Sequence, residues 1–217
     1  MNFEQARFNM IEQQIRPWDV LDPAVLSLLS VVKREDFVPA AYRNMAFTDT
    51  ELPLGAGHLA LAPRVEARLL QSLAVERHEK VLEIGTGTGF LAAMLGHRAQ
   101  RVITLESNAA IAKQAGDNLR RAGLANVTVR EGDGRLGLAG EAPFDAILLS
   151  GSVQEVPDAL LQQLKVGGRL LAIVGDEPVM RATLVRRVSE QEFKSEALFD
   201  TLAPRLPGFA DSNAFSF

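Results

Sequence analysis

Residues 81–90, with the sequence VLEIGTGTGF, constrain the fold of this chain more than any other segment. An apolar strand runs through an acidic residue into a turn in which every second residue is glycine, and a helix then begins at Phe90. Glycines let a backbone turn tightly and approach a ligand with no side chain between them. The helix that follows directs unpaired N–H groups at whatever lies in the turn. The segment therefore predicts an α/β fold with a nucleotide-type cofactor at the end of this strand.

The chain from Lys80 onward alternates between strand and helix patterns. This alternation implies parallel strands joined by crossover helices that cover both faces of a sheet. The helix pattern fades after Gly175, so the last two strands are expected to form an antiparallel edge. We expect an α/β domain over residues 76–217, with strands at 80–84, 101–105, 126–130, 144–149, 168–174, 183–188 and 193–198 and helices at 88–97, 108–122 and 157–164.

Residues 1–75 are expected to be mostly helical. Asn2 can cap a first helix and Asp22 a second one. Pro63 begins a third helix, whose apolar residues share one face. Residues 52–57 (LPLGAG) are predicted to be a loop because of their proline and paired glycines. A helical N-terminal segment thus precedes the α/β domain, and we expect the two to form one structural unit.

The composition argues against several classes of function. A net charge of −4 gives no electrostatic reason to bind nucleic acid or an anionic membrane, and neither is expected as a partner. The chain has no cysteine, hence no disulfide and no thiolate nucleophile, which is compatible with the cytoplasmic localisation that we expect. No secretory pattern and no apolar run of roughly 20 residues is visible. The three histidines form no metal pattern, so no metal site is predicted.

Acidic residues follow two further strands of the predicted sheet. Glu106 ends the second strand, where a carboxylate can accept hydrogen bonds from both hydroxyls of a ribose. Asp133 follows the third strand and can accept from the exocyclic amine of an adenine. Because the carboxyl ends of parallel strands meet at one edge, these residues and the glycine turn predict a single cofactor site. Asp145 stands at the entry of the fourth strand and is predicted to be structural. The expected cofactor-binding residues are Glu83, Gly85, Thr86, Gly87, Gly89, Glu106, Asp133 and Gly134.

Two classes of cofactor fit a glycine turn that is followed by an acidic residue. Dinucleotide-binding sheets space their glycines as G-x-G-x-x-G, which would place the third glycine at position 90, where this chain has Phe90. The turn here is instead Gly-x-Gly-x-Gly, preceded by Glu83, and a further Gly-Asp-Gly follows the third strand. These details favour S-adenosyl-L-methionine, and an NAD-dependent dehydrogenase is the less favoured alternative.

Over almost its full length, the chain resembles the protein-L-isoaspartate O-methyltransferase family. The segments that carry the resemblance are residues 32–39 (VKREDFVP), 52–57 (LPLGAG), 81–90, 131–134 (EGDG), 142–147 (APFDAI) and 156–168. The glycine turn fits any class I methyltransferase, whereas the first two segments are more specific to this family. The resemblance implies a Rossmann-like class I methyltransferase fold, with a mostly parallel seven-stranded sheet, an antiparallel edge and N-terminal helices that contribute to the substrate pocket.

The resemblance also implies a reaction, namely methyl transfer from S-adenosyl-L-methionine to an isoaspartyl carboxylate of a protein or peptide, as in protein repair. Such a carboxylate is ionised at neutral pH, so its attack on the methyl group needs no general base. Alignment of the reactants and exclusion of water would then carry the catalysis. Neither a metal nor a covalent nucleophile is required.

The chain departs from this family in the expected acceptor pocket. Active members carry a Thr-Ile-Ser triplet whose hydroxyls line the methyl-transfer site, and the aligned residues here are Leu59, Ala60 and Leu61. Alkyl groups cannot donate a hydrogen bond to a carboxylate. No catalytic residue is therefore assigned, isoaspartyl activity is expected to be weak or absent, and His58 is the nearest alternative donor. Residues 152–154 (SVQ) also differ from the family's Ala-Pro-Pro-like stretch.

These departures leave two alternatives beside isoaspartyl methylation. The first is a paralogue on the same fold with another methyl acceptor. The second is a catalytically silent cofactor-binding module that engages a partner through its N-terminal helices or through the tail with Phe209, Phe215 and Phe217. An adenine methyltransferase of nucleic acids is disfavoured, because residues 150–153 (SGSV) lack the Asn/Asp-Pro-Pro-aromatic element of such enzymes. The sequence leaves the oligomeric state open.

Overall fold

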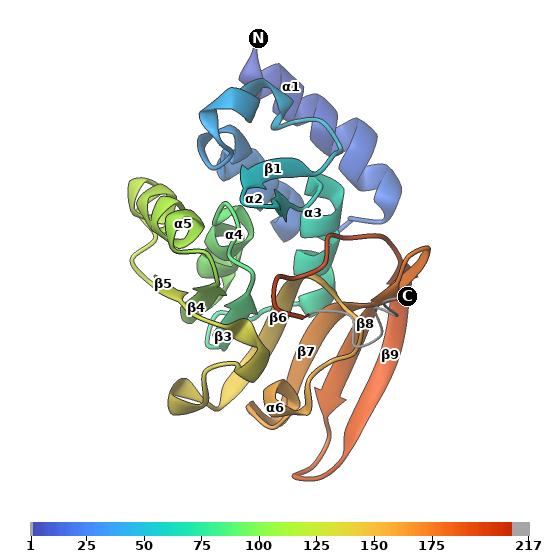
Figure 1. Cartoon of the computed structure of the whole chain (residues 1–217). Helices are drawn as coiled ribbons and strands as arrows, with labels where there is room; N and C mark the ends of the chain where they lie inside the picture. The colour runs from blue at the N-terminus through green and yellow to red at the C-terminus, as the bar shows by residue number, and fades with distance from the viewer. Residues whose placement is uncertain (1, 210–217) are drawn as a thin grey trace, which may run out of the picture.

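A seven-stranded sheet forms the centre of the molecule in the computed structural model, which describes residues 2–209. Its strand order is β5-β4-β3-β6-β7-β8-β9, with the order reversing beside β3 (Figure 1). The strands from β5 to β7 run parallel, whereas β8 and β9 pair antiparallel at the edge. The strands are β3 (Lys80–Ile84), β4 (Arg101–Glu106), β5 (Val127–Glu131), β6 (Phe144–Val153), β7 (Leu164–Asp176), β8 (Val179–Arg187) and β9 (Phe193–Asp200). The α/β class, the parallel sheet and the antiparallel edge are thereby confirmed.

Helices α4 (Phe90–Arg98) and α5 (Ala109–Arg121) connect the first three of these strands, close to their predicted positions. Asn108 begins α5 by accepting hydrogen bonds from two backbone N–H groups of its first turn. The helix predicted over residues 157–164 is wrong in length, since α6 spans only Asp158–Leu161. The side chain of Gln163 bonds to backbone atoms of Leu136, Leu138 and Ala159, and β7 begins at the next residue.

The N-terminal segment is a helical cap on one side of the sheet (Figure 1). Its helices are α1 (Phe3–Met10), α2 (Pro23–Val31) and α3 (Pro63–Leu73), together with the short helices η1 (Ile11–Ile15), η2 (Arg16–Trp18), η3 (Arg34–Asp36) and η4 (Ala40–Met45). The side chains of Asn2 and Asp22 cap α1 and α2, as predicted. One apolar core joins the two parts, because cap residues such as Ile15 and Leu29 belong to the same buried cluster as Leu148 of β6.

The loop predicted over residues 52–57 is wrong. Strands β1 (Leu52–Gly55) and β2 (His58–Ala60) instead form an antiparallel hairpin. The turn itself takes only residues 55–57, whose φ angles of 94°, 50° and 79° are all positive. Proline is tolerated at the edge of such a two-stranded ribbon. The hairpin places His58 and Leu59 above the carboxyl ends of the central strands.

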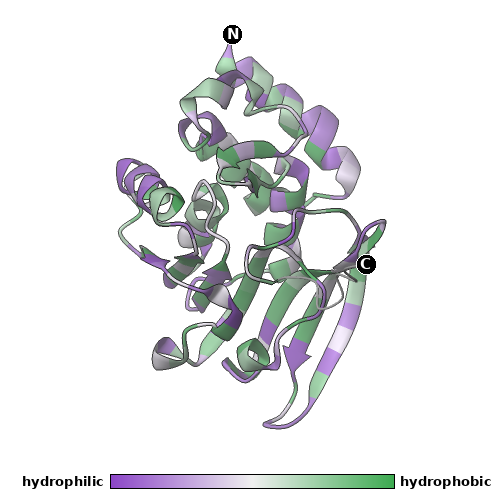
Figure 2. Cartoon of the chain, viewed as in Figure 1, coloured by the Kyte–Doolittle hydropathy of each residue, from purple (hydrophilic) through white to green (hydrophobic). Residues whose placement is uncertain are grey.

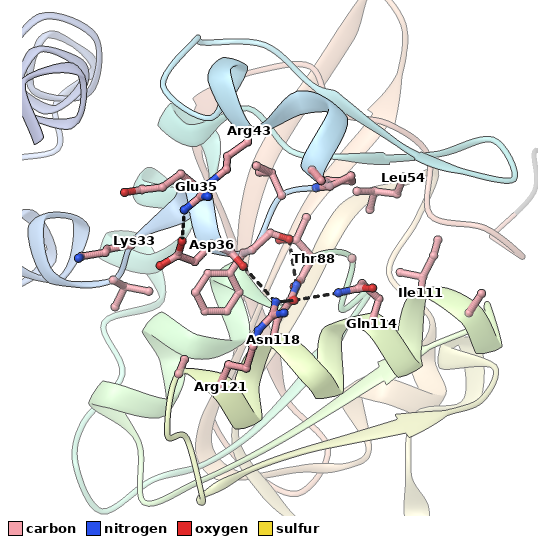
Figure 3. A pocket seen from close by; sticks show the side chains of 18 of the residues that line it. Lys33, Glu35, Asp36, Arg43, Leu54, Thr88, Ile111, Gln114, Asn118 and Arg121 are labelled. Carbon is pink, nitrogen blue, oxygen red and sulfur yellow. Dashed lines mark hydrogen bonds and ion pairs between the residues drawn. The ribbon is translucent and has the colours of Figure 1, made fainter. Parts of the chain in front are cut away.

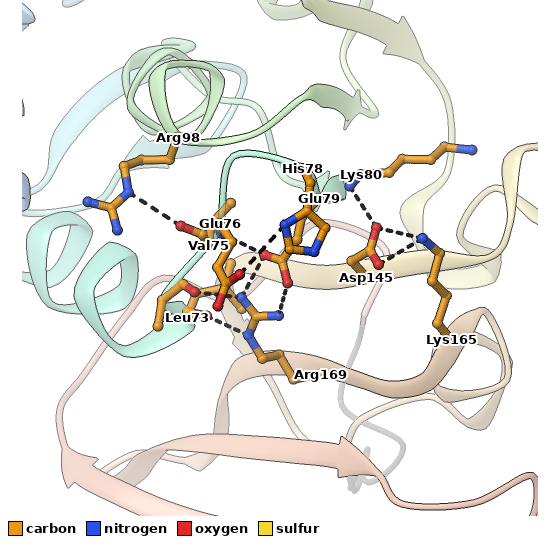
Figure 4. A network of polar contacts seen from close by, with 11 residues as sticks. Leu73, Val75, Glu76, His78, Glu79, Lys80, Arg98, Asp145, Lys165 and Arg169 are labelled. Carbon is orange, nitrogen blue, oxygen red and sulfur yellow. Dashed lines mark hydrogen bonds and ion pairs between the residues drawn. The ribbon is translucent and has the colours of Figure 1, made fainter.

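Ion pairs tie these elements together, and one of them, Arg169–Glu79, is buried. Arg169 of β7 donates to both carboxylate oxygens of Glu79, at 2.6 and 2.9 Å, and to the backbone at the end of α3 (Figure 4). Asp145 accepts from the Lys80 backbone N–H at 2.8 Å and from the Lys165 ammonium group, so its predicted structural role is confirmed. Figure 2 shows the resulting distribution, with apolar central strands and hydrophilic residues on the outer side of α5 and along β9. No helix within residues 2–209 is long and apolar enough to cross a bilayer.

Candidate functional site

A small cavity of about 50 Å³ lies at the carboxyl ends of β3, β4 and β6. The hairpin and the chain after β9 complete its wall. The glycine turn, the end of β4 and the chain after β5 thus meet at one place, as the sequence predicts. The lining residues are Gly85, Gly87, Glu106, Ser107, Gly132, Gly134 and Ser150 from the sheet side, Leu54, Gly57, His58 and Leu59 from the hairpin, and Pro204, Arg205, Leu206 and Pro207 from the C-terminal chain, with Ile84 and Leu105 between them.

The glycines of the turn serve two different contacts. Gly85 has a φ of 93° and lies in the cavity wall, where a methyl group on its Cα would come within 2.6 Å of the Leu206 side chain. Gly89 begins α4 and is not in the wall, and a methyl group there would press on Ala115 and Leu119 of α5. Gly85 and Gly87 are therefore placed to face a ligand, while Gly89 allows the two helices to pack closely.

Glu106 is the acidic group of the cavity wall, and it is 3% exposed. Its Oε2 accepts a 3.0 Å hydrogen bond from the Gly87 N–H, and its Oε1 accepts from the Asn108 N–H at 3.1 Å. The Nδ1 atom of His58 lies 3.5 Å from the same Oε1. The carboxylate thus holds the glycine turn in place and keeps lone pairs directed at the cavity.

Glu83 lies one layer below the cavity, fully buried and outside its wall. It accepts hydrogen bonds of 2.7 Å from the hydroxyls of Thr104 and Ser150, and Thr104 is bonded in turn to Thr86 at 2.6 Å. Burial away from water raises the pKa of Glu83 to about 7, against the lowering effect of these hydroxyls. Ser150 does line the cavity, so Glu83 and Thr86 are linked to it only through other residues.

The segment after β5 places Gly134 in the cavity wall but Asp133 outside it. Asp133 is exposed and accepts four hydrogen bonds from Arg135, one from the backbone N–H at 2.9 Å, two from its Nε and one from its Nη2. The hydrogen bonds from Arg135 lower the pKa of Asp133. A methyl group on Gly134 would lie 2.2 Å from Ile84, so close packing excludes a side chain here.

The two leucines that replace the family's hydroxyls lie in different surroundings. Leu59 is 42% exposed and lines the cavity. Leu61 is 5% exposed, belongs to the main apolar core and lies outside the cavity wall. The carbonyl of Leu61 accepts a 2.8 Å hydrogen bond from buried Arg34, which also bonds to Glu66 and to the Ala46 carbonyl.

A wider groove of about 960 Å³ continues from the turn between the cap and α5 (Figure 3). Leu54 and Gly87 line both the groove and the cavity. Asn118 spans its floor, where its side chain donates 2.9 Å hydrogen bonds to the carbonyls of Phe37 and Thr88 (Figure 3). Sequence reasoning missed Asn118, although a polar residue on the apolar face of a helix was the available signal.

The C-terminal chain is the other contributor that sequence reasoning did not place. Residues 204–207 line the cavity, and Phe209 is buried in a second apolar cluster with Leu206. Phe215 and Phe217 lie outside the residues that the structure describes. Within residues 2–209, no three His, Asp or Glu side chains are grouped to hold a metal ion.

Comparison with known proteins relates this site to one family. The family model described as protein-L-isoaspartate(D-aspartate) O-methyltransferase matches residues 5–202. The protein-L-isoaspartate O-methyltransferase 1 of Syntrophobacter fumaroxidans is 41% identical over 85% of this chain and 86% of its own length. The corresponding protein of Syntrophus aciditrophicus is 38% identical over 90% of this chain and 91% of its own length.

A solved structure supports the same fold. A candidate protein-L-isoaspartate O-methyltransferase of Plasmodium falciparum, solved in complex with S-adenosyl-L-homocysteine, superposes with a TM-score of 0.77 at 18% identity, over 95% of this chain and 98% of that one. The resemblance inferred from the sequence segments is confirmed by these matches. The chain belongs to the protein-L-isoaspartate(D-aspartate) O-methyltransferase family.

Proposed function

We propose that this protein uses S-adenosyl-L-methionine to methylate isoaspartyl carboxylates in proteins or peptides. The observation that carries the proposal is the meeting of the glycine turn, Glu106 and Gly134 at one cavity, in a chain that matches the family over residues 5–202. The cytoplasm remains the expected setting, in keeping with the lack of cysteine.

The residues of the cavity fit this cofactor. Gly85 and Gly87 line the cavity without side chains, so the backbone of the turn allows a close approach. Glu106 offers carboxylate oxygens for ribose hydroxyls, and Gly132 and Gly134 offer backbone for an adenine. Thr86 and Gly89 would support the turn from behind, and Asp133 would reach the adenine only after turning from Arg135.

The bound cofactor would supply an electrophilic methyl group. The protein's own part would be to align the acceptor and to exclude water, since an ionised carboxylate needs no base. A donor in the wall that can hold such a carboxylate is the His58 imidazole. The aliphatic hairpin residue Leu59 would help to keep the reacting groups dry.

The proposal is tested by incubating the protein with cofactor labelled in its methyl group and an isoaspartyl peptide. The normal aspartyl peptide of the same sequence is the matched control. Base-labile label on the isoaspartyl peptide alone is the expected result. Label on neither peptide, with intact cofactor binding, would contradict the assigned acceptor.

A second acceptor class is favoured by one observation, the alkyl side chain of Leu59 in the cavity wall where the family has a hydroxyl. An uncharged acceptor would lose no hydrogen bond there, and the Ser150–Glu83 pair could take up its proton. The same labelled cofactor offered with hydroxyl- and amine-bearing peptides tests this alternative. Transfer to such peptides in preference to the isoaspartyl peptide would select it.

A further inference from the structure

The chain after β9 crosses the predicted cofactor site from one side to the other. Residues 203–209 run from the end of β6, over the glycine turn, towards Asp133 (dark red in Figure 1). The family match ends at residue 202, so this segment lies beyond the part that the chain shares with the family model. We call residues 203–209 the strap.

The backbone of the strap pairs with β6 in the manner of a short added strand. The Ser152 N–H donates to the Pro204 carbonyl at 2.8 Å, and the Leu206 N–H donates to the Ser152 carbonyl at 2.9 Å. Arg205 adds an ion pair with Asp176 and a 3.0 Å hydrogen bond to the Gly175 carbonyl at the end of β7. These contacts give the strap one defined position.

The side chains of the strap fill the space in front of the glycine turn. Leu206 is 6% exposed and packs against Gly85 and Gly151. A methyl group added to either glycine would lie only 2.6 or 2.8 Å from the Leu206 Cδ2 atom. Gly208 then passes Asp133 and Arg135, since a methyl group added to it would lie within 3.9 Å of both. Phe209 anchors the far end in the second apolar cluster.

The remaining space is too small for a nucleoside cofactor. The cavity between strap and glycine turn measures about 50 Å³, whereas pockets for ligands of this size are typically ~300–1,000 Å³. The strap therefore occupies volume that the cofactor needs. The hydroxyl of Ser152, the β6 residue that pairs with the strap, is buried without a hydrogen-bond partner among the described residues.

We propose that the strap is an autoinhibitory segment that closes the cofactor site and is displaced when S-adenosyl-L-methionine binds. The inference rests on the cofactor assignment of the proposed function. Because only the open form binds cofactor, the apparent affinity equals the affinity of the open form multiplied by the fraction of molecules that are open. Any partner or sequence change that holds the strap away from β6 would raise that affinity, with no change in the glycine turn or Glu106.

Limited proteolysis of the full chain reports the position of the strap directly. Trypsin can cut after Arg205 and release residues 206–217, which mass spectrometry quantifies. Cleavage tracks the population of the open form, so saturating S-adenosyl-L-homocysteine should speed this cut at least about fivefold. Cleavage after exposed Arg77, remote from the strap, is the internal control and should not change. An unchanged or slower cut after Arg205 in the presence of bound ligand would contradict the autoinhibitory role of the strap.

Calorimetry with S-adenosyl-L-homocysteine provides the second measurement. Leu206→Ala removes contacts made only in the closed form and should tighten binding roughly tenfold. Leu202→Ala, which changes a 49% exposed residue just before the strap, is the matched control and should bind as the natural protein does. Equal affinity of Leu206→Ala and the natural protein for S-adenosyl-L-homocysteine would also contradict the autoinhibitory role of the strap.

The two proposals fail in different ways. Absence of ligand binding in the natural protein, in folded Leu206→Ala and in a folded chain that ends at Leu202 would overturn the cofactor assignment and the strap together. Binding by the natural protein with unchanged proteolysis would overturn the strap alone. Binding that appears only in the shortened chain or in Leu206→Ala would support both.

Discussion

The Ser150 hydroxyl donates a 2.7 Å hydrogen bond to Glu83, a carboxyl group that has no exposed surface. Ser150 lines the cavity and Glu83 lies behind it, so this bond connects the cavity to the interior of the sheet. Burial raises the pKa of Glu83 to about 7. The protonation state of a buried group next to the site therefore changes within the physiological pH range.

We expect Glu83 to make stability depend on pH. Its folded-state pKa of about 7 is above its ordinary value of 4.5, so the folded protein binds this proton more tightly than the unfolded chain. The contribution is complete below pH 4.5 and is lost as the pH rises towards 7. Glu83→Gln cannot ionise at this position. Between pH 5 and pH 8, its free energy of unfolding should therefore rise by about 2–3 kcal/mol relative to that of the natural protein.

Urea denaturation at pH 5 and pH 8 measures this difference. Glu76→Gln, an exposed change near the start of the sheet, is the control and should follow the natural protein. Burial also raises the pKa of Glu66, so Glu83→Gln should remove only part of the slope. If the free energies of unfolding of Glu83→Gln and the natural protein change in parallel with pH, the raised pKa of Glu83 would be contradicted.

Glu106 is expected to determine cofactor affinity. Glu106→Gln keeps the shape of the side chain but removes the charge that we expect to accept hydrogen bonds from ribose hydroxyls, which should weaken binding by roughly 1.5–3 kcal/mol. Calorimetry with S-adenosyl-L-homocysteine measures the loss. Because Glu106 also accepts from the Gly87 N–H, a thermal melt must show that the variant is folded. Unchanged affinity in a folded variant would remove Glu106 from the site.

The hairpin predicts a gain of activity from one substitution. Leu59→Thr places a hydroxyl in the cavity wall and should raise isoaspartyl methylation about tenfold if its hydrogen bond forms in the transition state. Cofactor affinity should stay the same. Leu61→Ser is the comparison, and it should mainly lower stability because Leu61 is buried in the core. Equal rates for Leu59→Thr and the natural protein would argue against a carboxylate bound at this residue.

Arg34 is expected to be essential for the cap. Arg34 is 1% exposed, and its guanidinium donates hydrogen bonds to Glu66 and to the carbonyls of Ala46 and Leu61. Arg34→Ala should cost about 3–5 kcal/mol, because it leaves a buried carboxylate unpaired. Arg43→Ala breaks an exposed pair with Asp36 and should cost less than about 1 kcal/mol. Urea midpoints of the two variants provide the test.

Removal of residues 1–50 should destroy cooperative folding. Ile15 and Leu29 of the cap share one apolar core with strands of the sheet, so the deletion exposes that core to water. Near-ultraviolet circular dichroism and a thermal melt would then show a molten or unfolded chain. A sharp melt at the temperature of the full chain would show that the α/β part is independent of the cap.

The sequence by itself determined the sheet and most of the residues that line the cavity at its carboxyl edge. Strand β3 spans the predicted residues, and the other strands differ only at their ends, because strand and helix periodicities are local properties. The positions of Gly85, Gly87, Glu106 and Gly134 at one cavity follow from parallel strands that end at the same edge.

Only the tertiary structure decided which of the predicted residues face the cavity. Leu59 faces it while Leu61 enters the core, and Glu83 lies behind Ser150 rather than in the wall. The register of a hairpin and the depth of a side chain depend on packing partners far away in the chain. The contact of Leu206 with Gly85 is of the same kind, since it joins residues that no local pattern relates. A proline- and glycine-rich tail carries no periodicity, so its position over the site is decided by the sheet that it meets.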